Sequence, residues 1–179
     1  PRSTLSSSSA ASDVYKRQGF SIAGATLVGQ HLGAKNEEQA KRAGWGAMRL
    51  SIISMTFFGV LITIFAEPLA RYMIDNDEVV RLTVIFIWLL GSMQPLMAIE
   101  FSLGGALRGA GDTKTPLAIT LTCLLFIRVF LAMIFFLLDA RVEVIFSTLV
   151  ADYVVKGFLY VARFRSDRWM NVLKTREAD

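Results

Sequence analysis

Long apolar stretches separated by short polar connections dominate the pattern of this chain. Residues 50–66 and 82–99 contain no charged side chain, and two later stretches contain one and two. A bilayer core about 30 Å thick needs roughly 20 mostly apolar residues per helix. The pattern therefore predicts an all-α, polytopic bundle of transmembrane helices. Its four complete crossings are expected at about residues 48–66, 81–107, 117–138 and 143–163.

The beginning of the chain departs from this pattern. Residues 1–18 are serine-rich and polar and lack the apolar core of a signal peptide, so we interpret them as a foreign or artefactual segment outside the fold. Residues 19–34 are too short to span a bilayer and are interpreted as the last turns of a helix whose start is missing. We therefore expect a piece of a longer protein, with a membrane domain over residues 19–169 and a cytoplasmic tail over residues 170–179.

The composition agrees with a membrane protein and excludes several kinds of functional site. Hydrophobic residues make up 54% of the chain and charged residues 19%, and the mean hydropathy is +0.49. The single cysteine, Cys123, lies in an apolar stretch, and His31 is the single histidine. These residues cannot supply a disulfide framework, a zinc site or a nucleophile with its base. The composition therefore excludes a soluble enzyme, and we expect no resident cofactor or metal.

Basic residues predict how the chain is oriented in the membrane. They concentrate in residues 35–49 and 108–114 and in the tail after residue 162, whereas residues 67–81 and 139–143 mix them with acids. Because cytoplasmic loops carry an excess of Lys and Arg, the first group is predicted to be cytoplasmic, together with the C-terminus.

The same basic residues bear on partners and on the end of the last helix. They form no single patch interleaved with aromatic residues, so we expect no nucleic-acid partner. Trp169 follows Arg163 and Arg165, and we predict that it anchors the last helix at the membrane interface.

Both connections of the predicted cytoplasmic side look like tight links between helices. In the first, Gly33 is predicted to end one helix in the left-handed conformation, and Asn36 to cap the next with Gln39 as its capping-box partner. In the second, glycines allow the outgoing helix to pack closely and to stop. Thr115 and Pro116 there suit the N-cap and first turn of the following helix.

The first of these connections reads Gly-Gln-x-Leu-Gly-Ala, and the second reads Leu-Arg-Gly-x-Gly-Asp-Thr-x-x-Pro. These motifs resemble those of the multidrug and toxic compound extrusion (MATE) family. They occur in the family's order and are separated by two crossings, as in that family. The motif positions, to which we assign a structural role, are Gly29, Gln30, Gly33, Ala34, Leu107, Arg108, Gly109, Gly111, Asp112, Thr113 and Pro116.

The resemblance implies an architecture of two six-helix lobes around a central cavity. This chain corresponds to the second lobe, from the end of the eighth helix through the twelfth. The implied protein is a multi-pass plasma-membrane exporter that exchanges organic, often cationic, compounds for H⁺ or Na⁺. Its implied partners are the lipid bilayer, the absent first lobe and small organic substrates.

Much of the family's coupling chemistry lies outside the helices present here, so this chain alone is expected to transport nothing. Two alternatives remain open at this stage: a lipid-linked saccharide flippase of the same superfamily, and a membrane-embedded enzyme. The glycine motifs favour the exporter.

Ionisable side chains inside the crossings are the candidates for binding substrate or the coupling cation. Glu100 lies about 12 Å along its helix from Arg108 and faces either the cavity or the interface. In one branch of the family an acidic residue aligned near Met97 helps to bind the cation, and Glu100 is one turn away. Arg128 needs a partner, for which Glu100 or Asp152 is available, and we favour a structural tether over a substrate contact.

Two further candidates complete the set. Asp152 and Lys156 are four residues apart with the acid first, which favours an ion pair with a mainly structural role. Gln94 precedes Pro95 in a predicted crossing. Because proline has no N–H, a backbone carbonyl near Pro95 is left without its helical partner, and either it lines the cavity or the helix only kinks there.

Overall fold

The computed structural model describes residues 3–73, 75–138, 142–170 and 172, and it describes side chains from residue 18 onwards except for residues 142–147. Every element in this part of the chain is helical, which confirms the all-α prediction. The α-helices are α1 (Ser3–Gly33), α2 (Glu37–Ile64), α3 (Ala66–Met73), α4 (Asp77–Gly109), α5 (Lys114–Thr122), α6 (Leu131–Leu137) and α7 (Val142–Arg165). A π-helical segment, η1 (Cys123–Phe130), joins α5 to α6, and a 3-10 turn, η2 (Arg168–Met170), follows α7.

Within the described residues, three helices are long and apolar enough to cross a bilayer: α2, α4 and the continuous helix from Lys114 to Leu137, called here the α5–α6 span. They overlap three of the predicted crossings. The fourth predicted crossing falls on α7, whose first side chains lie outside the described part. α4 remains helical through Pro95, and the short helix α3 was not predicted.

The start of α1 falls inside the segment that we interpreted as foreign to the fold. Its backbone is helical from Ser3, while the side chains before residue 18 lie outside the described part. The interpretation of residues 1–18 therefore stays a prediction. The predicted tail is described at residues 170 and 172.

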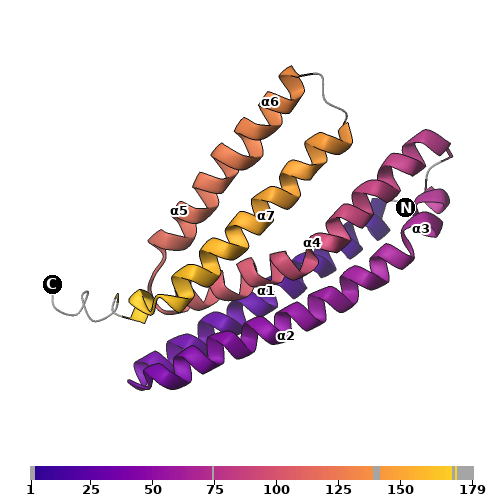
Figure 1. Cartoon of the computed structure of the whole chain (residues 1–179). Coiled ribbons are helices and arrows are strands. Elements are labelled where there is room, and N and C mark those ends of the chain that lie inside the picture. Colours follow the sequence, from indigo (N-terminus) through magenta and orange to yellow (C-terminus); the bar gives the residue numbers. More distant parts are fainter. Residues whose placement is uncertain (1–2, 74, 139–141, 171, 173–179) are drawn as a thin grey trace.

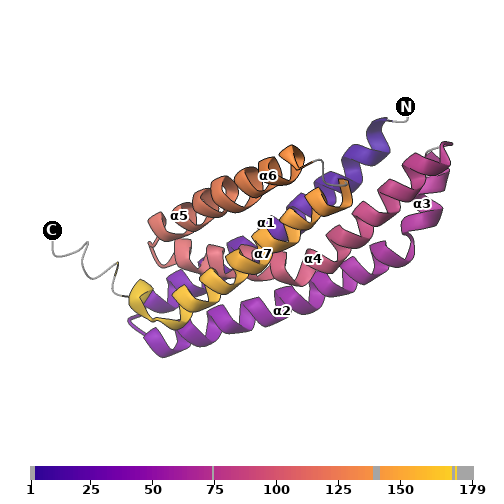
Figure 2. The same ribbon diagram turned by 45° about the horizontal axis from the view of Figure 1, so that its top comes forward.

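α4 is the central helix of the bundle. It contacts α1 and α2 on one side and α7 on another, and α7 in turn contacts the α5–α6 span. α1, α2 and α4 form one group of helices, and α7 with the α5–α6 span forms a pair angled away from it (Figure 1). A turned view shows both groups meeting at the end where α7 finishes and α2 begins (Figure 2).

α1 and α4 pack backbone to backbone because α4 presents glycine at the contact. A Cβ atom at Gly105 would overlap the backbone of Ser21, and one at Gly109 would overlap the backbone of Ala25. A Cβ at Gly29 would lie 3.1 Å from the carbonyl oxygen of Gly109. The spacing of Gly105 and Gly109 is the small-xxx-small pattern of close helix pairs in membranes. The two motif connections are thus in direct contact.

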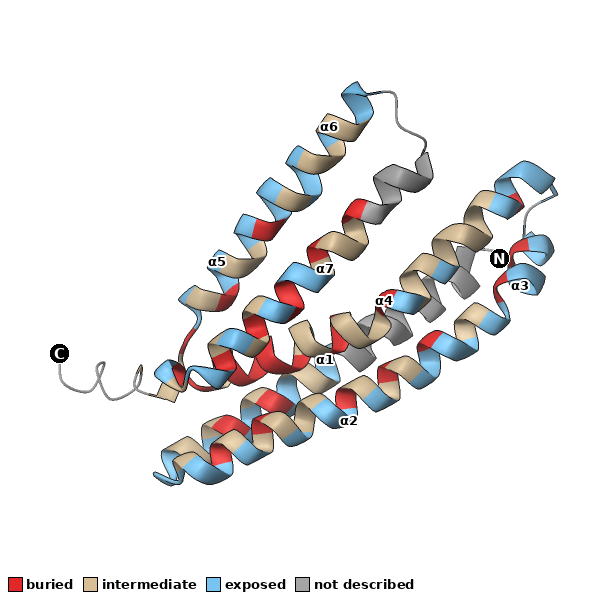
Figure 3. Cartoon of the chain, in the orientation of Figure 1, coloured by how far each residue is buried: buried red, intermediate tan, exposed pale blue. Residues whose placement is uncertain are grey.

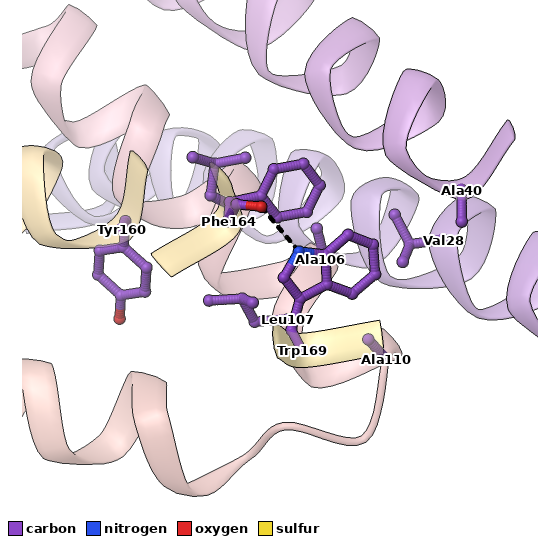
Figure 4. Packing of buried hydrophobic residues seen from close by; sticks show 9 residues of the cluster. Val28, Ala40, Ala106, Leu107, Ala110, Tyr160, Phe164 and Trp169 are labelled. Carbon is purple, nitrogen blue, oxygen red and sulfur yellow. Dashed lines mark hydrogen bonds between the residues drawn. The ribbon is translucent and has the colours of Figure 1, made fainter. Parts of the chain in front are cut away.

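A cluster of buried apolar residues lies at the end of the bundle where α1, α2, α4 and α7 meet (Figure 4). Trp169 is fully buried there, stacks on Phe164 with ring centroids 4.7 Å apart, and donates its indole N–H to the Phe164 carbonyl at 2.8 Å. The predicted interfacial anchor is therefore wrong. Asp167 adopts a left-handed φ of 56°, and the turn after α7 places Trp169 against Phe164.

The two connections confirm some of the predicted turn residues and correct others. Gly33 is the last residue of α1, and Lys35 adopts the left-handed φ of 57° that we predicted for Gly33. The Asn36 cap is confirmed, because its side chain accepts a hydrogen bond from the Gln39 N–H at 3.1 Å. In the second connection Gly111 has a φ of 82°, and α5 begins before the predicted cap at Thr115.

The faces of the helices away from these contacts are apolar and largely exposed (Figure 3). In the most apolar windows of α2, α4 and the α5–α6 span, 17%, 22% and 6% of the residues are buried. Exposed apolar faces are what the hydrocarbon of a bilayer solvates. The bundle is therefore built to lie in lipid.

Candidate functional site

A buried ionic cluster lies where α7 crosses α4, and it consists of Glu100, Asp152 and Lys156. The Lys156 ammonium donates to Asp152 Oδ2 at 2.8 Å and lies 3.9 Å from Glu100 Oε1. The exposed fractions of these side chains are 5% for Lys156, 0% for Asp152 and 15% for Glu100. Three ionisable groups are thus held together away from the ends of the helices.

The helices explain how these groups meet. Asp152 and Lys156 lie one turn apart on α7, so the predicted ion pair forms within a single helix. Glu100 comes from α4, and its approach to Lys156 depends on the α4–α7 contact. The Lys156 ammonium also lies 5.2 Å from the centre of the Tyr153 ring, a cation–π distance.

The cluster is not fully satisfied. Asp152 Oδ1 is buried and has no hydrogen-bond partner among the residues that the structure describes. With both carboxylates ionised, one ammonium balances one of them and leaves one negative charge. A buried uncompensated charge is costly, so the cluster favours an additional positive charge or a proton.

Arg128 is not part of this cluster. It lies on η1 with an exposed side chain, and in the described part of the chain it forms no ion pair with Glu100 or Asp152. The partner that these carboxylates have is Lys156. The helix position of Arg128 could be predicted from the sequence, but the direction of its side chain depends on the π-helical segment that carries it.

Gln94 lines a separate site, an apolar cavity of about 450 Å³ between α1, α2 and α4. Its walls are mostly hydrophobic and include Phe20, Leu27, Leu50 and Phe58. A Cβ at Gly59 would lie 2.8 Å from Gln94 Cγ, which places Gln94 on the α2 side of α4. Glu100 faces α7, so these two candidates serve different sites.

The second motif connection is held by an ion pair that we did not predict. Arg163, near the end of α7, donates to Asp112 Oδ2 through Nε at 3.0 Å and through an η nitrogen at 2.6 Å. Asp112 also accepts from the Thr115 N–H at 3.1 Å and from the Thr115 hydroxyl at 2.9 Å. The N-cap residue of α5 is therefore Thr113 and not the predicted Thr115, while Asp112 accepts from the first turn of α5 and ties it to α7.

The spacing of polar residues along α7 could have indicated that Arg163 faces another helix and not lipid. Asp152, Lys156, Tyr160 and Arg163 follow one another at intervals of four, four and three residues, which places them on one face of α7. The Tyr160 hydroxyl extends the polar line by donating to the Pro116 carbonyl at 3.3 Å. A polar stripe on an otherwise apolar helix predicts contact with another helix rather than with lipid.

Replacing Asp112 with asparagine is expected to lower stability at neutral pH by about 1.5 kcal/mol, the net value of a hydrogen bond to a charged group. Burial alone would raise the pKa of Asp112, but hydrogen bonds from Arg163 and Thr115 outweigh it and hold the pKa below its ordinary value. A carboxyl with a lowered pKa stabilises the fold above its ordinary pKa and loses that contribution as the pH falls through the folded-state pKa.

Thermal unfolding in detergent from about pH 7 down to about pH 3 measures this difference. The difference in stability between the wild type and Asp112→Asn should shrink as the pH falls. A constant difference between the two proteins across this range would contradict the assignment.

A family model described as MatE matches residues 14–134, about two thirds of the chain. The chain belongs to the MatE family. The match includes both motif connections, Gln94, Glu100 and Arg128, and it ends before Asp152 and Lys156. Membership agrees with the motif resemblance, and with the three apolar helices it makes this a membrane protein.

Curated relatives carry names from drug resistance. The probable multidrug resistance protein NorM of Thermotoga maritima is 30% identical over 160 residues, 84% of this chain and 33% of that protein. The probable multidrug resistance protein YoeA of Bacillus subtilis is 30% identical over 98 residues, 55% of this chain and 21% of that protein. Multidrug and toxin extrusion protein 1 of Pongo abelii is 25% identical over 96 residues, 54% of this chain and 17% of that protein.

No solved structure matches this MatE chain. The chain spans a third or less of the length of the relatives named above.

Proposed function

We propose that the full-length MatE protein containing this chain is a secondary active multidrug exporter. It exchanges organic, often cationic, compounds for H⁺ or Na⁺ by alternating access. The names of the relatives support drug export. The observation that carries the coupling is the buried cluster of Glu100, Asp152 and Lys156, which holds two carboxylates and one ammonium in the membrane.

A proton suits this cluster better than a sodium ion. The Lys156 ammonium already lies within 2.8 Å of one carboxylate oxygen and 3.9 Å of another, so a metal cation entering there would meet a like charge. A proton neutralises the excess carboxylate without needing space or further oxygen ligands. Glu100 is the more exposed acid of the two and the natural proton acceptor.

Protonation offers a physical route to transport. A neutral Glu100 lowers the cost of placing the cluster against lipid or a dry interface, whereas an ionised Glu100 favours contact with water. The two protonation states therefore stabilise different arrangements of the lobes, and a proton gradient biases the exchange between them. A cationic substrate competes with the proton for the same negative charge.

The cavity beside Gln94 is the proposed contact for the apolar body of the substrate. Its volume of about 450 Å³ lies within the range of small-molecule sites, and its lining is apolar except for a few groups such as Ser54 and Gln94.

We place the protein in the plasma membrane as a multi-pass protein with its C-terminus in the cytoplasm. The distribution of basic residues supports this orientation, because they concentrate in the two motif connections and after residue 162.

Glu100→Gln in the full-length protein is expected to reduce dye efflux about tenfold or more, within the usual range of coupling free energies, because the amide cannot exchange a proton. The measurement uses cells that lack their own pumps, with membrane abundance checked in parallel. Glu67→Gln is the matched control, since Glu67 is an exposed acid on α3. Its efflux should equal that of the wild type.

Two further arms separate the parts of this proposal. A protonophore should stop wild-type efflux, and collapse of the sodium gradient should not. Unchanged efflux in Glu100→Gln would move the coupling site out of this chain, while no efflux from the wild type with any dye would reject the exporter itself.

A further inference from the structure

The first half of α2 carries a groove that the transport mechanism does not use. Its volume is about 530 Å³. It is called here the α2 groove, and its lining residues are Glu38, Lys41, Arg42, Trp45, Gly46 and Arg49. Gly46 leaves the floor open, because a Cβ atom there would meet nothing within 4 Å.

The cations of the α2 groove are only partly neutralised. Arg42 pairs with Glu38 at 2.6 Å, and these side chains are 69% and 76% exposed. Such an exposed pair contributes little free energy, so Arg42 is free to bind another anion. Lys41 pairs with Asp167 at 2.7 Å, whereas Arg49 is exposed and forms no ion pair with any described residue. The groove therefore presents an excess of positive charge.

The α2 groove lies at the depth of lipid headgroups. Arg49 directly precedes the uncharged residues 50–64 of α2, so it marks the edge of the hydrocarbon. Arg42 is seven residues earlier, about 10 Å nearer the water. Trp45 lies between them and packs edge-on against Phe164 at 5.4 Å, which holds one wall of the groove in place. Tryptophan is the residue typical of this membrane depth.

An exposed apolar stripe continues from the groove down the same face of α2. Ile53 and Phe57 are 68% and 65% exposed, and with Gly46 they follow the spacing of one helical face. A cationic recess that opens onto an apolar stripe matches a molecule with an anionic head and hydrocarbon chains. A soluble acidic partner would leave the stripe unused.

We propose that the α2 groove binds the headgroup of an anionic phospholipid from the surrounding bilayer. Arg49 and Arg42 donate to the phosphate oxygens, and the acyl chains lie along Ile53 and Phe57. Charge complementarity supports this occupant, since anionic lipids are enriched in the cytoplasmic leaflet and basic pockets beside membrane helices bind their headgroups. The leaflet assignment rests on the proposed orientation, while the binding chemistry does not.

The test measures thermal unfolding of the full-length protein in detergent with added phosphatidylglycerol, phosphatidylcholine or inorganic phosphate. We expect phosphatidylglycerol to raise the melting temperature and the other two to have little effect. Arg49→Gln should weaken the response to phosphatidylglycerol about fivefold in concentration, the usual effect of one basic residue. Arg81→Gln is the matched control, since Arg81 is an exposed arginine at the start of α4, and its response should equal that of the wild type.

Gly46→Leu supplies a second, independent test. A Cβ atom at Gly46 meets nothing within 4 Å, so a leucine should be accommodated by α2 and should occupy the groove floor. The variant is therefore expected to fold and to lose the lipid response. Equal responses to both lipids, or an unchanged response in both variants, would overturn the proposal. Equal stabilisation by inorganic phosphate would overturn it as well, because the site would then be a simple anion site. The assay involves no transport, so its result is independent of the exporter assignment.

Discussion

Replacing Lys156 with methionine is expected to destabilise the full-length protein by about 3–5 kcal/mol, the usual cost of removing one partner from a buried ion pair. Methionine keeps a similar length and removes the charge. Asp152 then remains fully buried with no ion-pair partner among the residues that the structure describes, and Glu100 loses the ammonium at 3.9 Å. Two carboxylates without compensation in the membrane are the physical origin of the loss.

The measurement is thermal or chemical unfolding in detergent, together with the amount of folded protein recovered from membranes. Asp152→Asn combined with Lys156→Met is the informative control, because it removes both charges of the pair and should recover most of the lost stability. If the single variant were as stable as the wild type, the pair would not be the compensated buried unit that the distances indicate. If the double variant were as unstable as the single one, packing rather than charge would be the cause.

Gly105→Ala and Gly109→Ala are each expected to destabilise the bundle by about 1–3 kcal/mol, the usual cost of overpacking. The added Cβ atoms overlap the backbone of Ser21 and Ala25 on α1, and a backbone cannot move aside as a flexible side chain can. α1 and α4 must therefore separate. Because alanine in place of glycine within a helix normally stabilises it by up to about 1 kcal/mol, the expected sign is opposite to the intrinsic preference.

Gly46→Ala is the control for this pair of variants. Gly46 lies inside α2, and a Cβ there has open space around it, so the substitution should stabilise the protein by about 0.5–1 kcal/mol. Unfolding of all three variants in one detergent compares the signs directly. A gain in stability at Gly105 would mean that α1 and α4 are not in backbone contact.

Relations within one helix could be predicted well from the sequence. The spacing of Asp152 and Lys156 predicted their ion pair. The position of Asn36 before a helical segment predicted that its side chain caps α2. Both depend on a fixed rise and rotation per residue, which every helix shares. Hydrophobic length likewise indicated α2, α4 and the α5–α6 span, because the thickness of a bilayer sets the length of a crossing.

Relations between helices were predicted less well. We considered Arg128 as the partner of the buried acids, but Glu100 approaches Lys156 instead. Trp169 was predicted at the membrane surface and is fully buried. The hydrophobic pattern predicts which residues are removed from water, but it does not distinguish contact with lipid from contact with another helix.

The amino-acid sequence alone determined that this is an all-α membrane protein, and its two glycine motifs indicated the MatE family, because hydrocarbon length and turn chemistry are local properties. The tertiary structure decided which charges meet. The crossing of α4 and α7 brings Glu100 to Lys156, and the end of α7 brings Arg163 to Asp112. These contacts depend on the angle and closeness of helix packing, which in turn depend on where small residues such as Gly105 let two backbones touch.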